Sequence, residues 1–228
     1  NTSWIGCTNE LNAGYAADGY ARVKGYGALV TTYGVGELSA INAIAGSFAE
    51  YVPVIKIVGI PATENIHKKT ILHHNFANPD YYAFEQAYSN VVQTTAYLTE
   101  KNAKTEIDRI LSVFINEKKP VYIAIPEDIC SLEINNISCI QKMTSNTYML
   151  DAVTEHIEKL LSRAKNPVIL ADILADRFEA KDALFKLLKN TGYPATNLLM
   201  GKGLINWNYK GYIGTYLGKY GNNLHITR

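Results

Sequence analysis

The 228-residue chain is long enough for one large domain or two smaller ones, and its apolar and charged fractions are ordinary for a globular protein. A formal net charge of +1 offers no basic surface for nucleic acid or an anionic membrane, and the apolar stretch from Val52 to Ile60 is far shorter than the ~20 residues of a membrane span. We therefore expect no nucleic-acid partner and no membrane partner.

The first part of the chain predicts a helix followed by a strand–helix–strand unit. A helix rich in small residues is expected after a cap at Thr8 or Asn9, with Glu10 in its first turn. Two apolar runs then follow, separated by one segment with helical periodicity. The expected elements are a strand at 28–33, a turn at Gly34-Val35-Gly36, a helix at 37–50 and a strand at 54–58. This is the pattern of a βαβ unit with parallel strands.

A second unit of the same kind follows, with a helix at 104–117 and a strand at 121–125. The strands of both units are nearly continuous apolar runs rather than alternating ones, which is typical of a sheet covered on both faces. We therefore expect an α/β fold, with a doubly wound, mostly parallel sheet and helices on both faces.

The regular pattern lapses after Pro126, and a second α/β pattern starts later in the chain. We expect a first domain at 1–132, a polar linker at 133–150 and an incomplete second α/β domain at 151–228. The elements expected in the second domain are a helix at 151–164, a strand at 168–171, a helix near 179–189 and a short apolar run after Pro194.

The cysteines bear on metals and on the compartment. Cys7, Cys130 and Cys139 form an odd, sparse set without metal-ligand spacing, which predicts free thiols in a reducing compartment. We therefore expect a cytoplasmic protein and no metal ligands within the chain. Because the sequence starts at Asn1 rather than at a methionine, we also expect that N-terminal residues are missing.

Three features of the first domain are candidates for chemistry, and each also has an ordinary structural explanation. Glu10 suits a catalytic carboxylate, but an acid in a first turn also interacts favourably with the helix macrodipole. Gly34-Val35-Gly36 resembles the start of a dinucleotide fingerprint, yet its third glycine would fall at Ser39, so a tight turn explains it as well. His73-His74 is a pair in a loop, and such a pair is more often an ordinary part of the surface than a catalytic group; adjacent histidines also point in different directions, which disfavours a bidentate metal site.

Longer motifs connect these features. In chain order they are NELNAGYAADGYAR at 9–22, TTYGVGELSA at 31–40, AGSFAE at 45–50, the pair His73-His74, EIDR at 106–109, PVYI at 120–123, PVILAD at 167–172 and MGKG at 200–203. With these motifs the chain resembles the pyruvate/indolepyruvate decarboxylase family of thiamine-diphosphate-dependent enzymes. The similarity covers most of that family's pyrimidine-binding domain, without its N-terminal strand and loop, and part of its central domain.

The resemblance implies a reaction and a set of residues. The reaction would be the non-oxidative decarboxylation of a 2-oxo acid, such as pyruvate or indolepyruvate, to an aldehyde and CO₂, with thiamine diphosphate as the electron sink. In the family, a glutamate at the position of Glu10 hydrogen-bonds N1′ of the aminopyrimidine, and a histidine pair takes part in proton transfer. The implied catalytic residues are Glu10, His73 and His74. The implied cofactor-binding residues are Glu10, Thr32, Gly34, Val35 and Gly36.

The resemblance also implies that the active site is incomplete in this chain. The family's upstream Gly-Asp loop and its C-terminal diphosphate-binding domain are both missing, so the Mg²⁺ ligands are expected outside the chain and the chain alone is expected to be inactive. Because the cofactor lies between subunits in the family, the expected partners are the 2-oxo acid and same-family subunits in a homodimer or homotetramer.

Some alternatives stay open. An acetohydroxyacid synthase or an oxidase relative would use the same cofactor, although the 9–22 motif and the histidine pair favour the decarboxylase. A truncated, non-catalytic domain would act by binding a partner.

The loop after His74 departs from the family, because Pro79 stands where a glycine-rich turn is usual, so the substrate pocket is expected to differ. The stretch at 81–84 (YYAF) would either border an aromatic-accepting pocket or pack as an ordinary helix.

Overall fold

The computed structural model describes residues 3–134 and 147–220. The chain folds into two compact units, Asn1–Met143 and Thr144–Arg228. The linker expected at 133–150 lies mostly outside the described residues, as does Cys139, whereas Cys7 and Cys130 are exposed free thiols. Among the described helices, none combines the length and the apolar character needed to span a membrane.

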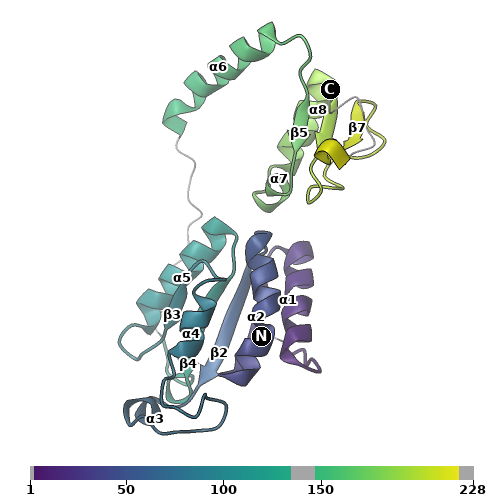
Figure 1. The fold of residues 1–228 in the computed structure, drawn as a ribbon. Helices are drawn as coiled ribbons and strands as arrows, with labels where there is room; N and C mark the ends of the chain where they lie inside the picture. The colour runs from purple at the N-terminus through teal and green to yellow at the C-terminus, as the bar shows by residue number, and fades with distance from the viewer. Residues whose placement is uncertain (1–2, 135–146, 221–228) are drawn as a thin grey trace. The chain divides into compact units, whose positions relative to one another are not determined.

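The first unit (purple to teal in Figure 1) is built on a four-stranded parallel sheet in the order β1-β2-β4-β3. Its strands are β1 (Gly27–Thr32), β2 (Val54–Ile60), β3 (Thr95–Tyr97) and β4 (Val121–Pro126). Its helices are α1 (Glu10–Lys24), α2 (Val35–Ala49), α3 (Thr63–His67), α4 (Ala83–Tyr88) and α5 (Ala103–Glu117), followed by the 3₁₀ turn η1 (Glu127–Ile129). The parallel strands joined by helices confirm the predicted α/β class.

Helices cover both faces of this sheet, but not to the same extent. Residues of α1, α2 and α4 share one core with β1, β2 and β4. On the opposite face, Ile110 and Phe114 of α5 pack against β3 and β4. As a result β4 is buried on both faces, whereas β1 is buried on one, because Leu29 is 4% exposed and the next residue, Val30, is 46% exposed. The continuous apolar run of β1 predicted burial on both faces of the strand, but among the described residues only one face is buried.

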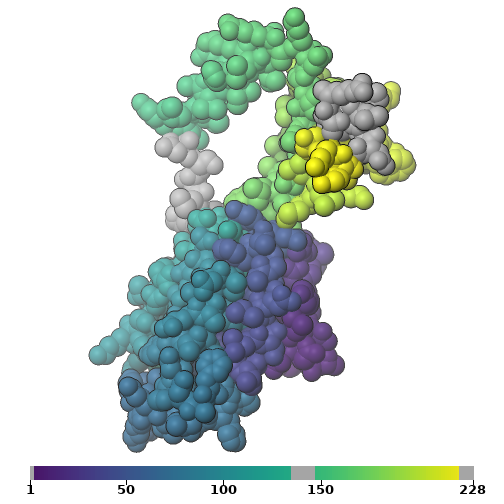
Figure 2. Space-filling model, in the orientation of Figure 1, coloured from purple at the N-terminus to yellow at the C-terminus, as the bar shows by residue number. Residues whose placement is uncertain are grey.

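Helix α1 begins and packs as its sequence predicts. The Asn9 side chain caps it by accepting a hydrogen bond from the Asn12 N–H at 2.8 Å. Its contact with α2 is close because the residues there are small, and a Cβ added at Gly14 would lie only 2.7 Å from the Cβ of Ala43. The other side of α1 is exposed at the surface of the first unit (purple in Figure 2), and Tyr20 there is 60% exposed.

The second unit is a smaller α/β assembly with a parallel sheet in the order β5-β6-β7. Its elements are η2 (Thr147–Met149), α6 (Leu150–Arg163), β5 (Ile169–Ala171), α7 (Leu174–Arg177), α8 (Lys181–Thr191), β6 (Ala195–Asn197), β7 (Tyr212–Thr215) and η3 (Gly218–Tyr220). A small core joins Ala171, Leu188 and Ala195. The predicted helix α6 forms, but its apolar stripe is open to solvent among the described residues, with Leu160 57% exposed.

Candidate cofactor site

The predicted site residues come together at the carboxyl edge of the first sheet. Thr32 ends β1, and the chain turns there into α2. The loop that leaves β2 carries the histidine pair, and the first turn of α1 carries Glu10. In open α/β sheets, ligands bind outside the carboxyl ends of the strands, so the position alone favours a binding site.

Glu10, Thr32 and Gly36 lie close together at the start of α2. A Cβ added at Gly36 would lie 2.6 Å from Cγ2 of Thr32 and 3.2 Å from Oε1 of Glu10. Because Gly36 has no side chain, Thr32 and the Glu10 carboxylate pack directly against the backbone of α2. Val35, one residue earlier, is 55% exposed and presents an apolar side chain at the same helix end. A carboxylate beside a helix N-terminus and an exposed apolar side chain suits a flat polar ring.

Gly34 connects the α2 turn to the histidine loop. Its φ of 68° lies in the left-handed region that glycine tolerates, which explains the tight strand-to-helix turn. A Cβ at Gly34 would fall 1.6 Å from the carbonyl oxygen of His74, so the two backbones are in direct contact. Tyr33 supports the contact, because its hydroxyl donates to the carbonyl of His73 at 2.7 Å and its ring meets the His74 ring edge-on at 5.8 Å.

The histidine loop has an unusual backbone. His74 has φ 69° and Ala77 has φ 56°, two left-handed conformations at residues other than glycine. Both histidine side chains are exposed. The expectation of a loop that differs from the family's remains a prediction, but Ala77 shows that a glycine conformation is here imposed on a residue with a side chain.

The stretch at 81–84 has mixed roles. Tyr81 is buried beside Tyr33, with ring centroids 6.0 Å apart, and its hydroxyl donates to the carbonyl of Thr70 at 2.6 Å. Phe84 is buried against Phe76, with ring centroids 4.7 Å apart. Tyr82 is exposed. Packing therefore explains Tyr81 and Phe84, and the packed Tyr81 supports the loop that carries the histidines.

A buried carboxylate lies under the turn, and sequence reasoning did not identify it. Glu37 is 0% exposed, and its carboxylate accepts hydrogen bonds from the Gly34 N–H and from the Tyr122 hydroxyl, each at 2.8 Å. Its own carbonyl accepts the Tyr88 hydroxyl. Burial raises the pKa of Glu37, and the donors from Gly34 and Tyr122 oppose that rise. The signal was present: an acid three residues after a helix cap reaches back to the cap N–H.

Lys56 is the second buried ionisable residue missed from sequence. It stands in the middle of β2, is 0% exposed, and donates to Oγ1 of Thr31 at 2.5 Å and to the carbonyl of Ile57 at 3.2 Å. Burial lowers the pKa of Lys56 to about 7, and the carboxylates of Glu37 and Glu10 partly offset that effect. A single lysine inside the apolar run VIKIVGI was the available signal.

No metal centre accompanies these residues in the described part of the chain. Residues 3–134 and 147–220 contain no group of three or more His, Cys, Asp or Glu side chains arranged to hold a metal ion.

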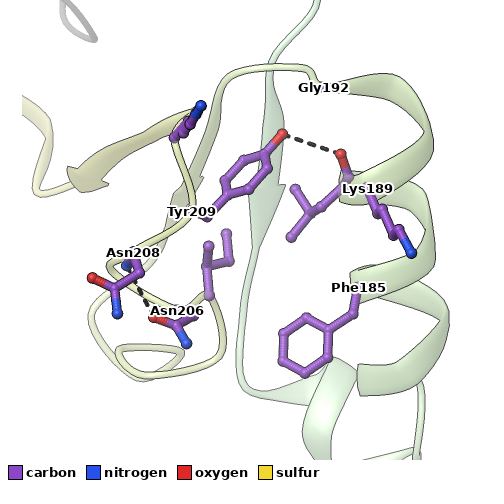
Figure 3. A pocket seen from close by; sticks show the side chains of 10 residues that line it. Phe185, Lys189, Gly192, Asn206, Asn208 and Tyr209 are labelled. Carbon is purple, nitrogen blue, oxygen red and sulfur yellow. Dashed lines mark hydrogen bonds between the residues drawn. The ribbon is translucent and has the colours of Figure 1, made fainter.

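A separate cavity of about 720 Å³ lies in the second unit between α8 and the loop before β7 (Figure 3). Phe185, Leu188 and Tyr209 line it, and the Tyr209 hydroxyl donates to the carbonyl of Tyr193 at 2.7 Å. None of the predicted site residues lines this cavity.

Comparison of the sequence with known protein families identifies the family of the chain. Residues 1–84 match the family described as "Thiamine pyrophosphate enzyme, N-terminal TPP binding domain", and residues 154–225 match "Thiamine pyrophosphate enzyme, central domain". The chain belongs to the thiamine pyrophosphate enzymes. The matched N-terminal stretch contains all the predicted catalytic and cofactor-binding residues.

Several pyruvate decarboxylases are similar to this chain. The chain is 41% identical over 221 residues to pyruvate decarboxylase of Kluyveromyces lactis and to pyruvate decarboxylase isozyme 2 of Saccharomyces cerevisiae. It is also 41% identical over 223 residues to pyruvate decarboxylase of Candida albicans. Each match covers 94% of this chain and 39% of the relative. The chain thus spans about two fifths of the length of the relatives that it matches.

The residues at the carboxyl edge fit the pyrimidine part of thiamine diphosphate. Gly36 has no side chain, so the Glu10 carboxylate lies close to the N-terminus of α2, 3.2 Å from the position of a Cβ. Glu10 provides a carboxylate that can hydrogen-bond a ring nitrogen, and the exposed Val35 provides an apolar surface. The described residues supply no comparable set of ligands for Mg²⁺.

Proposed function

We propose that this chain provides the pyrimidine side of a thiamine diphosphate site in an enzyme that decarboxylates a 2-oxo acid, without oxidation, to an aldehyde and CO₂. The observation that carries the proposal is the Glu10 carboxylate against Gly36, beside Thr32, at the N-terminus of α2. The similarity to pyruvate decarboxylases supports the reaction class. Residues 1–132 would form the pyrimidine-binding domain and residues 151–228 part of the central domain.

Each site residue has a separate task in this proposal. Thiamine diphosphate, when bound, supplies the electron sink that lets CO₂ leave. Glu10 would accept or donate a hydrogen bond at the aminopyrimidine, and Thr32, Gly34, Val35 and Gly36 would form the surface that receives the ring. The imidazoles of His73 and His74 would donate and accept protons at the substrate, because an imidazole nitrogen can act as an acid or as a base.

The rest of the site lies beyond these residues. The Mg²⁺ ligands and the diphosphate contacts come from outside the chain, and a second subunit of a homodimer or homotetramer completes the cleft. The exposed thiols of Cys7 and Cys130 suit a reducing, cytoplasmic environment.

The proposal is tested with the full-length protein that carries this chain. Thiamine diphosphate binding in the presence of Mg²⁺ is measured by calorimetry, and CO₂ and aldehyde are measured with pyruvate, indolepyruvate and phenylpyruvate. We expect binding and stoichiometric release of CO₂ and aldehyde. A condensation product in place of the aldehyde would assign the protein to the acetohydroxyacid synthases. A protein without cofactor binding would act as a non-catalytic, partner-binding domain, and the proposal would be wrong.

A further inference from the structure

Lys56 is a buried cation in a strand that otherwise contains no charge. Transfer of an ammonium from water to a protein interior is unfavourable unless it is well paired, and a well-packed apolar residue at such a site is often at least as stabilising. Neither of the two hydrogen bonds that Lys56 donates is to a carboxylate. Stability of the core is therefore a poor explanation for a lysine at this position.

Lys56 is connected to the cofactor-facing turn through Thr31. The lysine Nζ donates to Oγ1 of Thr31 at 2.5 Å, and the same hydroxyl donates to the carbonyl of Thr32 at 2.8 Å. Cγ2 of Thr32 lies 2.6 Å from the position of a Cβ on Gly36. The ammonium therefore fixes the Thr31 hydroxyl, this hydroxyl fixes the end of β1, and the end of β1 positions Thr32 beside Gly36 and Glu10.

Carboxylates face Lys56 from two other elements. Glu37 reaches under the turn from α2 and anchors the Gly34 N–H at 2.8 Å, and Glu10 approaches from α1. From α4 the ring of Tyr88 lies 5.9 Å from the lysine Nζ, and from β4 the Tyr122 hydroxyl binds Glu37. One ammonium thus balances two acidic groups in a region from which water is largely excluded.

We infer that Lys56 is a positioning residue: acting through Thr31 and Glu37, it holds the turn at Gly34 and Gly36, and with it Thr32, in the arrangement that receives the pyrimidine ring beside Glu10. This inference rests on the proposed function, because it assigns Lys56 a role only if the ring binds there. Lys56 itself touches neither the substrate nor the cofactor.

The test compares cofactor affinity with folding in the full-length protein. Lys56→Met alone would leave Glu37 buried without a cation, so the main variant is the neutral pair Glu37→Gln with Lys56→Met, which keeps the shape of both side chains. Thr31→Val cuts the link to Thr32 and leaves the charges in place. Ile57→Met, on the opposite face of β2, is the matched control. Thermal unfolding without cofactor and the Kd for thiamine diphosphate with Mg²⁺ are measured for each.

We expect the neutral pair to unfold close to the wild-type temperature but to bind the cofactor about tenfold or more weakly. Thr31→Val should weaken binding several-fold, and Ile57→Met should leave the Kd unchanged. The pH dependence of Kd is a second measurement, and a change in protein stability alone would not alter it. Between about pH 6 and pH 8, where Lys56 exchanges its proton, the wild-type profile should contain a change that the neutral pair lacks.

Two outcomes overturn the inference. The first is a folded neutral pair with wild-type Kd and wild-type pH profile. The second, which decides the matter if the neutral pair does not fold, is a wild-type Kd for Thr31→Val. A wild-type protein that binds no thiamine diphosphate overturns the proposed function and this inference together, so the two failures are distinguishable.

Discussion

The substitution Gly36→Ala separates the stability of α2 from its role at the site. Alanine is a better helix former than glycine by about 1 kcal/mol. The new Cβ would, however, lie 2.6 Å from Cγ2 of Thr32 and 3.2 Å from Oε1 of Glu10. Overpacking of this kind costs about 1–3 kcal/mol. The two effects nearly offset each other, and we expect the free energy of unfolding to fall by only about 0–2 kcal/mol.

Cofactor binding should respond far more strongly than stability. The added methyl group would displace the side chains of Thr32 and Glu10 from the positions in which they are proposed to receive the ring. We expect the Kd for thiamine diphosphate to rise at least tenfold, which corresponds to about 1.4 kcal/mol. Calorimetry with Mg²⁺ and urea unfolding, both on the full-length protein, measure the two quantities.

Gly46→Ala is the matched control, because Gly46 is in the same helix and a Cβ there would meet nothing within 4 Å. This variant should be more stable by about 0.5–1 kcal/mol and should bind the cofactor with unchanged Kd. If Gly36→Ala keeps the wild-type Kd, the pyrimidine does not lie against the start of α2 and the site has to be sought elsewhere.

Three other changes test separate parts of the structure. Glu10→Gln should lower turnover by at least ~10²–10⁴-fold in the full-length enzyme, as is typical when an acid–base group is lost, and near-normal steady-state rates would contradict the assignment. Ala77→Gly should raise the free energy of unfolding by about 0.5–1 kcal/mol, because φ 56° strains alanine and not glycine; a loss of stability in urea would show that the loop has another conformation. Since Lys56 has a folded-state pKa of about 7 against 10.5 unfolded, only the unfolded chain carries this proton between those values, so stability should rise with pH across that window. The neutral pair Glu37→Gln with Lys56→Met should weaken the rise between about pH 7 and pH 9 in denaturant titrations, and an identical slope in both proteins would show that burial does not lower the pKa of Lys56.

The long periodic elements could be predicted from sequence because local pattern and tertiary burial agree in them. The helix expected at 104–117 and α5 (Ala103–Glu117) differ by one residue, since an apolar stripe of four turns leaves little choice of face. The helix after Gly34 starts at Val35, two residues earlier than expected, because the Gly34 N–H is capped by Glu37. Strand β3 was missed, since three residues, TAY, are too few for a periodic signal.

The site could be predicted only in part, because motifs identify residue types and not contacts between distant segments. Glu10 and the glycine turn were found through their motif. The backbone contact of Gly34 with His74 joins residues 40 positions apart and has no local pattern. The buried pair of Glu37 and Lys56 was overlooked for a similar reason, since each was read within its own element and neither one predicts the other.

The contact between Gly34 and the His74 carbonyl also limits how this protein can be redesigned. With only 1.6 Å between that oxygen and the position of a Cβ, every residue except glycine at position 34 forces the histidine loop away. The Tyr33 hydroxyl on the His73 carbonyl ties the same two segments a second time. A chimera meant to change the substrate range therefore has to take residues 33–37 and 70–77 from a single donor. A histidine loop grafted alone would lack the matching residues 33–37 against which it packs.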